Sequence, residues 1–291
     1  MTIDTTARIR ALPCWRGPLH ISPLSGGMTN HNFVVSDSQG RWVVRLGADL
    51  PEHGVLRRHE PLVARAAHAI GLSPEVVHAE PGLMVSRFID GRTLEADDLR
   101  DPRYLAATVH LLRRCHQHMR PRWQLPAPRF GVFDVVRAYG GELQARAEHL
   151  LQGRLEDLLA LARSLETSVV PLPAVFCHND LLAANLIDDG ERLWLIDWDY
   201  AGLGNPLFDL ANLSTNNGIG PLGDAPLLEL YFGGPPSAAL AESLRAMQLA
   251  SMLREVLWGA VSACYRRVEF DYAAYTRDCL ERLDQRRSVC G

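Results

Sequence analysis

The residues of this 291-residue chain that most clearly suggest chemistry are two acidic side chains and an amide in its second half. Asn185 follows Asp180 after four intervening residues, and Asp197 ends the next apolar run. Phosphoryl transfer needs a carboxylate that orients and deprotonates a hydroxyl, and oxygen ligands for a Mg²⁺ ion that neutralises phosphate charge. Asp180 suits the first task, and Asn185 with Asp197 suits the second. We therefore predict a phosphoryl-transfer site, with Asp199 as an additional candidate metal ligand.

The spacing of these residues strengthens that prediction. An Asp followed by an Asn after four residues matches the catalytic loop of protein kinases, and Asp197 stands where those enzymes place a metal-binding Asp. A His-x-Asp pattern alone fits an ordinary polar loop equally well, so the prediction depends on the ordered set of three residues. His178, two residues before Asp180, joins the candidate catalytic residues.

A glycine-containing segment near the N-terminus is the candidate nucleotide-binding loop. It lies between two predicted strands, where glycines let the backbone approach phosphates closely. Arg45 follows on the third strand, and its permanently charged guanidinium can donate two hydrogen bonds to phosphate oxygens. Glu60, on the next predicted helix, could form an ion pair with Arg45. Alternatively, Glu60 is a solvated residue on the surface of that helix. The candidate loop residues are Ser25, Gly26, Gly27, Thr29 and Asn30.

The basic residues of the chain are all arginine. The chain has 30 Lys plus Arg against 34 Asp plus Glu, a formal charge of −4, and it contains no lysine. This excludes mechanisms that need a lysine amine, such as a phosphate-binding P-loop Lys or a Schiff base. The mildly acidic balance argues against a nucleic-acid partner, which would require a basic face. Phosphate must therefore be bound by Arg, backbone N–H groups or a metal ion.

Cysteine usage and hydropathy indicate the compartment. The six cysteines are scattered without metal-ligand spacing, so we expect reduced thiols. No apolar run approaches the roughly 20 residues that cross a bilayer, and the N-terminal segment lacks an apolar signal region. We expect a cytoplasmic protein without membrane insertion. No pattern in the sequence indicates an oligomeric state.

The elements that must position these residues fall into two groups, an α+β organisation. Residues 1–90 form a small β-rich lobe, with strands predicted at 19–24, 32–35, 42–46, 76–78 and 83–88 and a helix within 56–70. Residues 91–291 form a larger, mainly helical lobe, with helices predicted at 104–118, 135–151, 155–165, 240–265 and 272–287. A hairpin turn at 188–190 precedes Asp197. Three histidines in the first of these helices, at 110, 116 and 118, are expected to be surface or satisfied residues without acidic partners.

Several motifs together resemble the choline/ethanolamine kinase group. This group belongs to a wider superfamily with thiamine kinases, aminoglycoside phosphotransferases and protein kinases, and the resemblance runs from about residue 19 to 283. It implies a protein-kinase-like two-lobed fold that uses ATP and Mg²⁺ and phosphorylates a small alcohol. The motifs are Leu24-Ser25-Gly26-Gly27-Met28-Thr29-Asn30, Val44-Arg45-Leu46, His178-Asn179-Asp180, Ile196-Asp197-Trp198-Asp199-Tyr200 and Phe208-Asp209-Leu210-Ala211.

The same resemblance implies roles for further residues. The backbone near Phe88 and Ile89 would meet the adenine, and Asp209 would accept hydrogen bonds from the backbone near His178. The C-terminal part is similar to the choline-kinase ending, in which a helix Trp precedes an apolar-Glu-Phe triplet and helps to bind choline. Trp258 occupies that position here.

Glu255 lies three residues before Trp258, so both can project from one helix face. An aromatic face with a carboxylate suits a quaternary ammonium, which cannot donate hydrogen bonds; a core Trp with a solvated Glu is the alternative. Tyr200 and Asn216 complete the candidate substrate residues. Members of that group often carry a Glu near the position of Asn216. Choline, ethanolamine and other small cationic alcohols are the candidate acceptors.

Three alternatives remain open. The chain could be a thiamine kinase or a kinase of another cationic alcohol, an aminoglycoside phosphotransferase, or a nucleotide-binding scaffold without catalytic activity. The complete set of Asp180, Asn185 and Asp197 argues against the scaffold.

Overall fold

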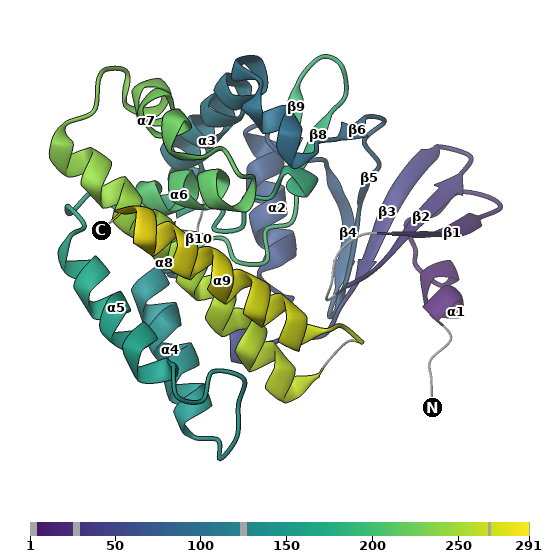
Figure 1. The fold of residues 1–291 in the computed structure, drawn as a ribbon. Helices are drawn as coiled ribbons and strands as arrows, with labels where there is room; N and C mark the ends of the chain where they lie inside the picture. The colour runs from purple at the N-terminus through teal and green to yellow at the C-terminus, as the bar shows by residue number, and fades with distance from the viewer. Residues whose placement is uncertain (1–4, 26–29, 123–126, 267–268, 291) are drawn as a thin grey trace. The chain divides into compact units, whose positions relative to one another are not determined.

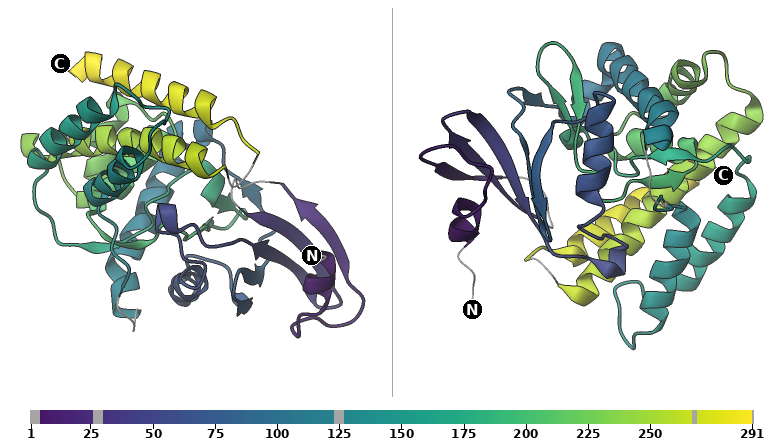
Figure 2. Two further views of the ribbon diagram at one scale, coloured as in Figure 1. Left: turned by 90° about the horizontal axis from the view of Figure 1, so that it is seen from below. Right: turned by 180° about the vertical axis from the view of Figure 1, so that it is seen from behind.

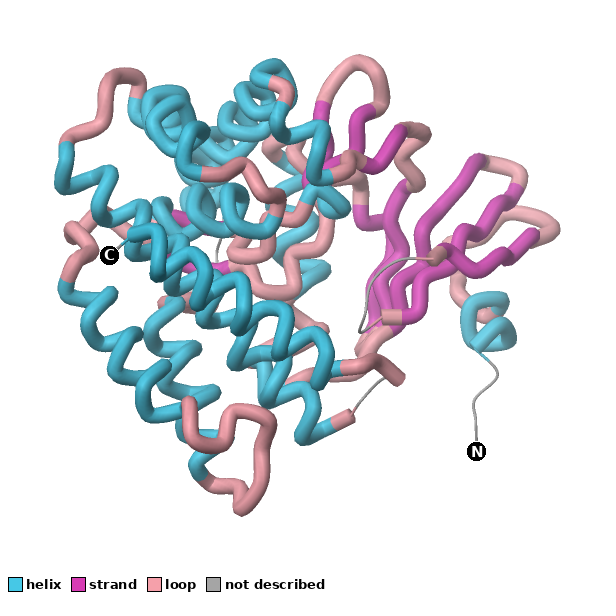
Figure 3. The backbone as a smooth tube through the Cα atoms, viewed as in Figure 1, coloured by secondary structure: helices cyan, strands magenta, loops and turns pink. Residues whose placement is uncertain are grey.

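The computed structural model describes residues 5–25, 30–122, 127–266 and 269–290 (Figure 1). Gly26, Gly27 and Thr29 of the candidate loop lie outside the described residues. The chain divides into two compact units. Unit 1 comprises the residues up to Arg92 together with Ile187–Asp199, and unit 2 comprises Thr93–Leu186 and the residues from Tyr200 onward. Figure 3 shows that strands predominate in unit 1 and helices in unit 2, as the predicted α+β class requires.

Unit 1 contains an antiparallel five-stranded sheet in the order β1-β2-β3-β5-β4. Strand periodicity explains which side chains it buries, because successive residues point to opposite faces. In β3, Trp42, Val44 and Leu46 are buried, so Arg45 lies on the other face. The buried face packs with Ile9 of α1 into one apolar core. The elements are α1 (Thr5–Arg10), β1 (His20–Leu24), β2 (His31–Asp37), β3 (Gly40–Leu46), β4 (Val76–Glu80) and β5 (Leu83–Arg87).

A helix and a hairpin complete unit 1. The segment that follows α2 holds the end of the hairpin: Leu195 donates its backbone N–H to the Leu72 carbonyl over 2.9 Å. The Ser73 hydroxyl donates to the Leu195 carbonyl and accepts from the Trp198 indole N–H over 2.7 Å. These bonds fix the backbone on both sides of Asp197. The elements are α2 (Glu60–Ala69), β8 (Leu186–Asp188) and β9 (Leu193–Leu195), with β6 (Arg92–Thr93) beside β8.

Unit 2 is organised around α8 (Ala238–Tyr265), a 28-residue helix. Most of its residues from Ser243 to Ser262 are buried, because helices α4, α5, α6, α7 and α9 all pack against it. Figure 2 shows α9 running along α8 in both views. The other elements are α3 (Pro102–Arg122), α4 (Val132–Gln144), α5 (Leu155–Thr167), β7 (Val175–Cys177), β10 (Gly202–Gly204), α6 (Pro206–Asn216), α7 (Asp224–Phe232) and α9 (Tyr272–Cys290).

One predicted helix is too long. The helix expected over 135–151 ends at Gln144, so the prediction is wrong beyond that residue. Buried side chains recur along α4 up to Leu143, and the next position of that stripe is Arg146, which is not buried. The apolar stripe therefore ends about two turns before the predicted boundary. None of the helices in the described ranges combines the length and apolar content of a membrane span.

Close contact between α8 and α9 depends on Gly259. A Cβ atom there would lie 2.6 Å from the Thr276 Oγ1 and 2.9 Å from a ring carbon of Tyr275. Both distances are shorter than van der Waals contact allows, so only glycine lets the two helices approach this closely.

We expect Gly259→Ala to destabilise the protein by about 1–3 kcal/mol, because the added methyl group overpacks this contact. Gly141→Ala is the matched control, since a Cβ at that exposed α4 position meets nothing within 4 Å. Its higher helix propensity should stabilise by up to about 1 kcal/mol. Urea unfolding midpoints of both variants test this, and an unchanged midpoint for Gly259→Ala would contradict the close contact.

Candidate active site

Two guanidinium groups and three carboxylates meet in unit 1. We call Arg45, Arg57, Glu60, Asp197 and Asp199 the charged cluster. Arg45 lies 3.0 Å from Glu60, 2.8 Å from Asp197 and 2.7 Å from Asp199, measured between nitrogen and oxygen. Arg57 lies 2.5 Å from the same Asp199 oxygen. The expected pair of Arg45 and Glu60 is therefore present, within a larger cluster.

The charged cluster brings three carboxyl groups together with two guanidinium groups. Burial and the neighbouring Asp199 and Asp197 raise the pKa of Glu60 to about 8, against the opposing effect of Arg45. Burial alone would lower the pKa of Arg45, but the surrounding carboxylates raise it. Carboxylate oxygens of Glu60, Asp197 and Asp199 lie within 4.8 Å of one another, and the buried Asp199 Oδ1 has no hydrogen-bond partner among the described atoms. Such a set of hard oxygen donors fits Mg²⁺.

Local backbone geometry makes room for the charged cluster. Asp197 has a φ of 67°, in the left-handed region. Arg57 reaches the cluster by passing over Gly47, where a Cβ would lie 2.9 Å from the Arg57 Nε, and that Nε donates to the Ala48 carbonyl over 2.9 Å. Sequence reasoning missed Arg57. Its position one helical turn before Glu60 was the available signal.

The other predicted nucleotide-binding residues of unit 1 flank its strands. Ser25 follows β1 and is exposed, and Asn30 precedes β2 and is half-buried. Phe88 and Ile89 follow β5 and are half-buried. Phe88 donates its backbone N–H to the Arg41 carbonyl over 3.0 Å, and its ring lies 4.3 Å from the Arg41 guanidinium carbon.

In unit 2, β7 pairs with β10 and leads directly into the loop 178–185, which carries the candidate catalytic residues. The fully buried Asp209 of α6 accepts hydrogen bonds from the backbone N–H groups of His178 over 2.9 Å and Asn179 over 2.7 Å. This confirms the orienting contact implied for Asp209. Asn179 has a left-handed φ of 68°, and its side chain donates to the Tyr200 carbonyl.

Two asparagines continue this attachment of the loop. Asn212, one turn after Asp209 on α6, accepts from the Leu181 N–H over 2.5 Å. Asn217, which follows α6, accepts from the Ala183 N–H over 2.7 Å and donates to the Leu181 carbonyl. Sequence reasoning missed both roles. The signal was a row of polar residues on an otherwise apolar helix, introduced by an Asn-Pro start that is typical of a capped N-terminus.

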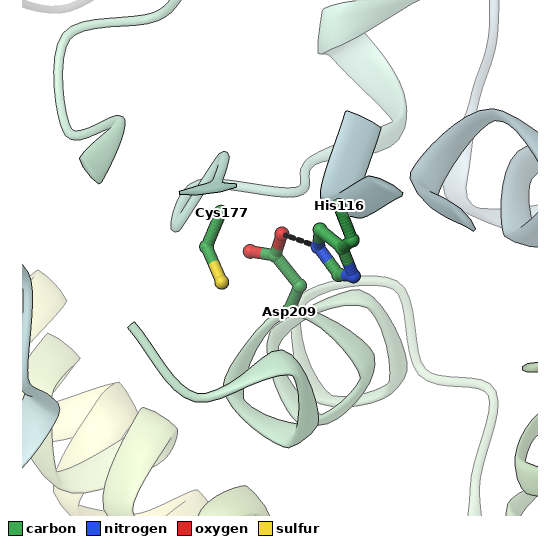
Figure 4. Close-up of side chains that lie close together, drawn as sticks. All are labelled: His116, Cys177 and Asp209. Carbon is green, nitrogen blue, oxygen red and sulfur yellow. Dashed lines mark hydrogen bonds and ion pairs between the residues drawn. The ribbon is translucent and has the colours of Figure 1, made fainter. Parts of the chain in front are cut away.

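Asp209 is itself held by His116 of α3 (Figure 4), and His116 in turn contacts Tyr231 of α7. The His116 Nε2 lies 2.8 Å from an Asp209 oxygen, and the His116 Nδ1 lies 2.6 Å from the Tyr231 hydroxyl. His116 therefore has an acidic partner, which corrects the sequence expectation; that partner lies 93 residues further along the chain. Burial alone would raise the pKa of Asp209, but His116 and the donated backbone bonds lower it. Cys177 lies beside this group as a thiol, since burial raises its pKa well above the ordinary range.

Asp180 lies near the start of the loop and Asn185 lies at its end. The Asn185 side-chain amide donates to the Asp180 carbonyl over 2.9 Å, which leaves its Oδ1 as the atom able to bind a cation. The Asp180 N–H donates to the Nδ1 of the fully buried His178 over 3.3 Å. His178 thus supports the loop backbone, and the Asp180 side chain keeps 20% exposure.

Near Asp180, unit 2 gathers aromatic and charged side chains that we call the acceptor cluster. The Trp258 indole donates to the Tyr200 hydroxyl over 3.0 Å, and its ring meets that of Tyr275 at a centroid distance of 5.6 Å. Tyr275 donates to Glu255 over 2.7 Å. Asn216 is half-buried in the last turn of α6. The members of the acceptor cluster are Tyr200, Arg254, Glu255, Trp258 and Tyr275.

Arg254 was missed by sequence reasoning. Its guanidinium is buried, pairs with Glu255, lies 3.8 Å from an Asp180 oxygen and stacks over the Tyr200 ring at 4.4 Å. It thereby connects the predicted substrate residues to the candidate base. Nothing in its local sequence distinguishes it from the surface arginines.

We expect Asp209→Asn to cost about 3 kcal/mol or more at pH 7, because it removes a buried charge that several donors surround. The folded pKa of Asp209 is lowered, so its contribution is present above the ordinary Asp range and is lost as the pH falls through the folded pKa. The difference in unfolding free energy between variant and wild type should therefore become smaller as the pH falls. Urea unfolding at several pH values measures it, with the exposed Asp157→Asn as control; a gap independent of pH would contradict the assignment.

Comparison with known proteins identifies the family. The profile of the phosphotransferase enzyme family matches residues 20–241. The LicA protein of Haemophilus influenzae is 30% identical over 218 residues, which cover 73% of this chain and 63% of that protein. A probable choline kinase 3 of Arabidopsis thaliana is 28% identical, with 89% of this chain and 84% of that protein covered. A choline/ethanolamine kinase family protein from Mesorhizobium loti superposes with a TM-score of 0.79 at 28% identity, covering 97% and 93% of the two chains. The predicted resemblance and the protein-kinase-like fold are confirmed, and the chain belongs to the phosphotransferase enzyme family.

Proposed function

We propose that the protein transfers the γ-phosphate of ATP to the hydroxyl group of choline or ethanolamine. One observation in unit 2 carries the proposal: the acceptor cluster places aromatic rings and a carboxylate beside Asp180, through Arg254. The relatives named choline kinase and choline/ethanolamine kinase family protein support the same acceptors. Because ATP is the proposed donor, we place the reaction in the cytoplasm.

Asp180 is the proposed general base. It accepts the proton of the acceptor hydroxyl as the oxygen attacks the γ-phosphorus, and the bond from phosphorus to the leaving ADP oxygen breaks. Its loop is fixed by Asp209, Asn212 and Asn217, so the carboxylate is presented by a rigid backbone. His178 contributes by supporting this backbone.

The acceptor cluster suits one positive charge. Asp180 and Glu255 contribute two negative charges and Arg254 one positive charge, so one negative charge remains uncompensated. A quaternary ammonium is recognised through aromatic faces and nearby carboxylates, because it has no N–H to donate. Trp258 and Tyr200 would supply the faces, and Asn216 adds no charge. A singly charged amino alcohol therefore fits this balance better than a polycationic aminoglycoside.

Nucleotide binding is assigned to unit 1. Arg45 would bind phosphate oxygens, held in place by its ion pair with Glu60, and Ser25 and Asn30 are further candidate phosphate-binding residues. Phe88 and Ile89 would meet the adenine. The proposed Mg²⁺ ligands, chosen by residue type and sequence spacing, are Asp197, Asp199 and Asn185. Bound there, the ion would neutralise phosphate charge.

The proposed reaction can be tested directly. With MgATP, the full chain should release ADP in the presence of choline or ethanolamine. Asp180→Asn should lower kcat by about 10²-fold or more while the KM for ATP changes little, because only the proton acceptor is lost. Coupled ADP release over a panel of alcohols is the measurement.

The exposed Asp157→Asn is the matched carboxylate control and should behave as wild type. Turnover of thiamine without choline would replace the proposed acceptor, and phosphorylation of aminoglycosides alone would do the same. Nucleotide binding with no acceptor-dependent ADP release would leave the scaffold alternative. Near-normal turnover by Asp180→Asn would overturn the assignment of the base.

Recognition of the acceptor can be tested separately. Trp258→Leu removes the aromatic face but keeps an apolar side chain, and a desolvated cation–π contact is worth about 2 kcal/mol, or roughly 30-fold. The KM for choline should rise by about that factor, whereas ethanolamine, whose ammonium can still donate to Glu255, should lose less. The KM for ATP is the internal control. Equal small losses for both alcohols would place recognition elsewhere.

A further inference from the structure

Arg254 occupies an unusual position in the acceptor cluster, because one of its nitrogens faces two carboxylates. Nη1 donates to Glu255 and also lies 3.8 Å from Asp180 Oδ1. The side chain is only 3% exposed, so these charges interact with little screening by solvent. One guanidinium thus stands between the predicted substrate carboxylate and the candidate base.

The guanidinium retains unused hydrogen-bonding capacity. The Nε and Nη2 of Arg254 are buried and make no hydrogen bond with the described atoms. The Tyr200 ring covers one face of the group at 4.4 Å. An approach of about 1 Å by the Asp180 carboxylate, which is 20% exposed, would convert the 3.8 Å ion pair into a charge-assisted hydrogen bond.

No other cation is supplied by the loop that carries Asp180. Residues 177–187 contain neither lysine nor arginine, and the chain contains no lysine at all. Within the described part of unit 2, the arginine that pairs with Asp180 comes from α8, 74 positions further along the chain. Because a helix buried among five others holds Arg254, its charge stands at a fixed place beside the loop.

We propose that Arg254 is a positioning residue for Asp180: it joins the candidate base to Glu255, so that one fixed cation orients both the proton acceptor and the carboxylate that faces the substrate. This inference rests on the proposed function. It explains why an arginine is buried next to two acidic groups that sequence reasoning treated as independent.

Three variants separate positioning from stability. Arg254→Leu and Glu255→Leu each leave a buried charge without its partner, so both should lower the urea unfolding midpoint. The double variant Arg254→Leu/Glu255→Leu removes the pair and should recover most of that midpoint. At saturating choline or ethanolamine, Glu255→Leu should raise the acceptor KM and largely keep kcat, because Arg254 still faces Asp180.

The kcat of the double variant distinguishes a positioning role of Arg254 from a purely structural one. We expect its kcat to remain about tenfold or more below that of Glu255→Leu, although its stability is higher, because a misplaced catalytic group costs rate without costing stability. Arg254→Lys, which keeps the charge, should recover part of the kcat lost in Arg254→Leu. Arg245→Leu, on the exposed side of the same helix, is the matched control and should change neither quantity.

Equal kcat values for the double variant and Glu255→Leu would overturn the inference. If the double variant does not fold, Arg254→Gln takes its place, and a wild-type kcat in Arg254→Gln would also overturn the inference. Failure of the proposed function looks different: wild type would then show no acceptor-dependent ADP release, and Asp180→Asn would change nothing.

Discussion

The buried carboxylate of Asp209 fixes the backbone on which the proposed chemistry depends. It is fully buried, and its charge is compensated by two backbone N–H groups of the loop and by His116. A buried anion is stable only when donors surround it, so the folded loop and the ionised carboxylate require one another. Asn212 and Asn217 extend the same attachment to the following residues. The backbone position of Asp180 is thus determined by α6, whereas the proposed contact with Arg254 acts on its side chain.

Because the chain contains no lysine, both units use arginine as the positive charge that faces their buried carboxylates. Each unit brings a buried arginine against several carboxylates, Arg45 in unit 1 and Arg254 in unit 2. A planar guanidinium can face two acidic groups at once and does not lose its proton on burial, whereas a buried lysine ammonium readily does. The net charge of each cluster therefore changes only when a carboxyl group gains or loses a proton, because the arginines stay positively charged.

Sequence reasoning succeeded where the signal was local or carried by a motif. The strand expected over 42–46 is present and Arg45 pairs with Glu60 as expected, and the ordered residues from Asp180 to Asp197 indicated the family that the comparisons confirm. It failed where partners are distant along the chain, because periodicity carries no information about which helices meet. Arg254 and the acidic partner of His116 belong to this class. The end of α4 was missed for another reason: helix-forming residues continue after the apolar stripe has stopped.

The left-handed backbone at Asn179 and Asp197 has a consequence for how such a chain can change. Side chains other than glycine pay about 1–3 kcal/mol in this region, although Asn and Asp tolerate it best. Glycine would relieve that strain at either position, yet it would delete the amide that reaches Tyr200 or a carboxylate of the charged cluster. Selection for stability and selection for activity therefore oppose each other at these two residues, and a search for stabilising substitutions guided by backbone conformation alone would choose the changes most damaging to the site.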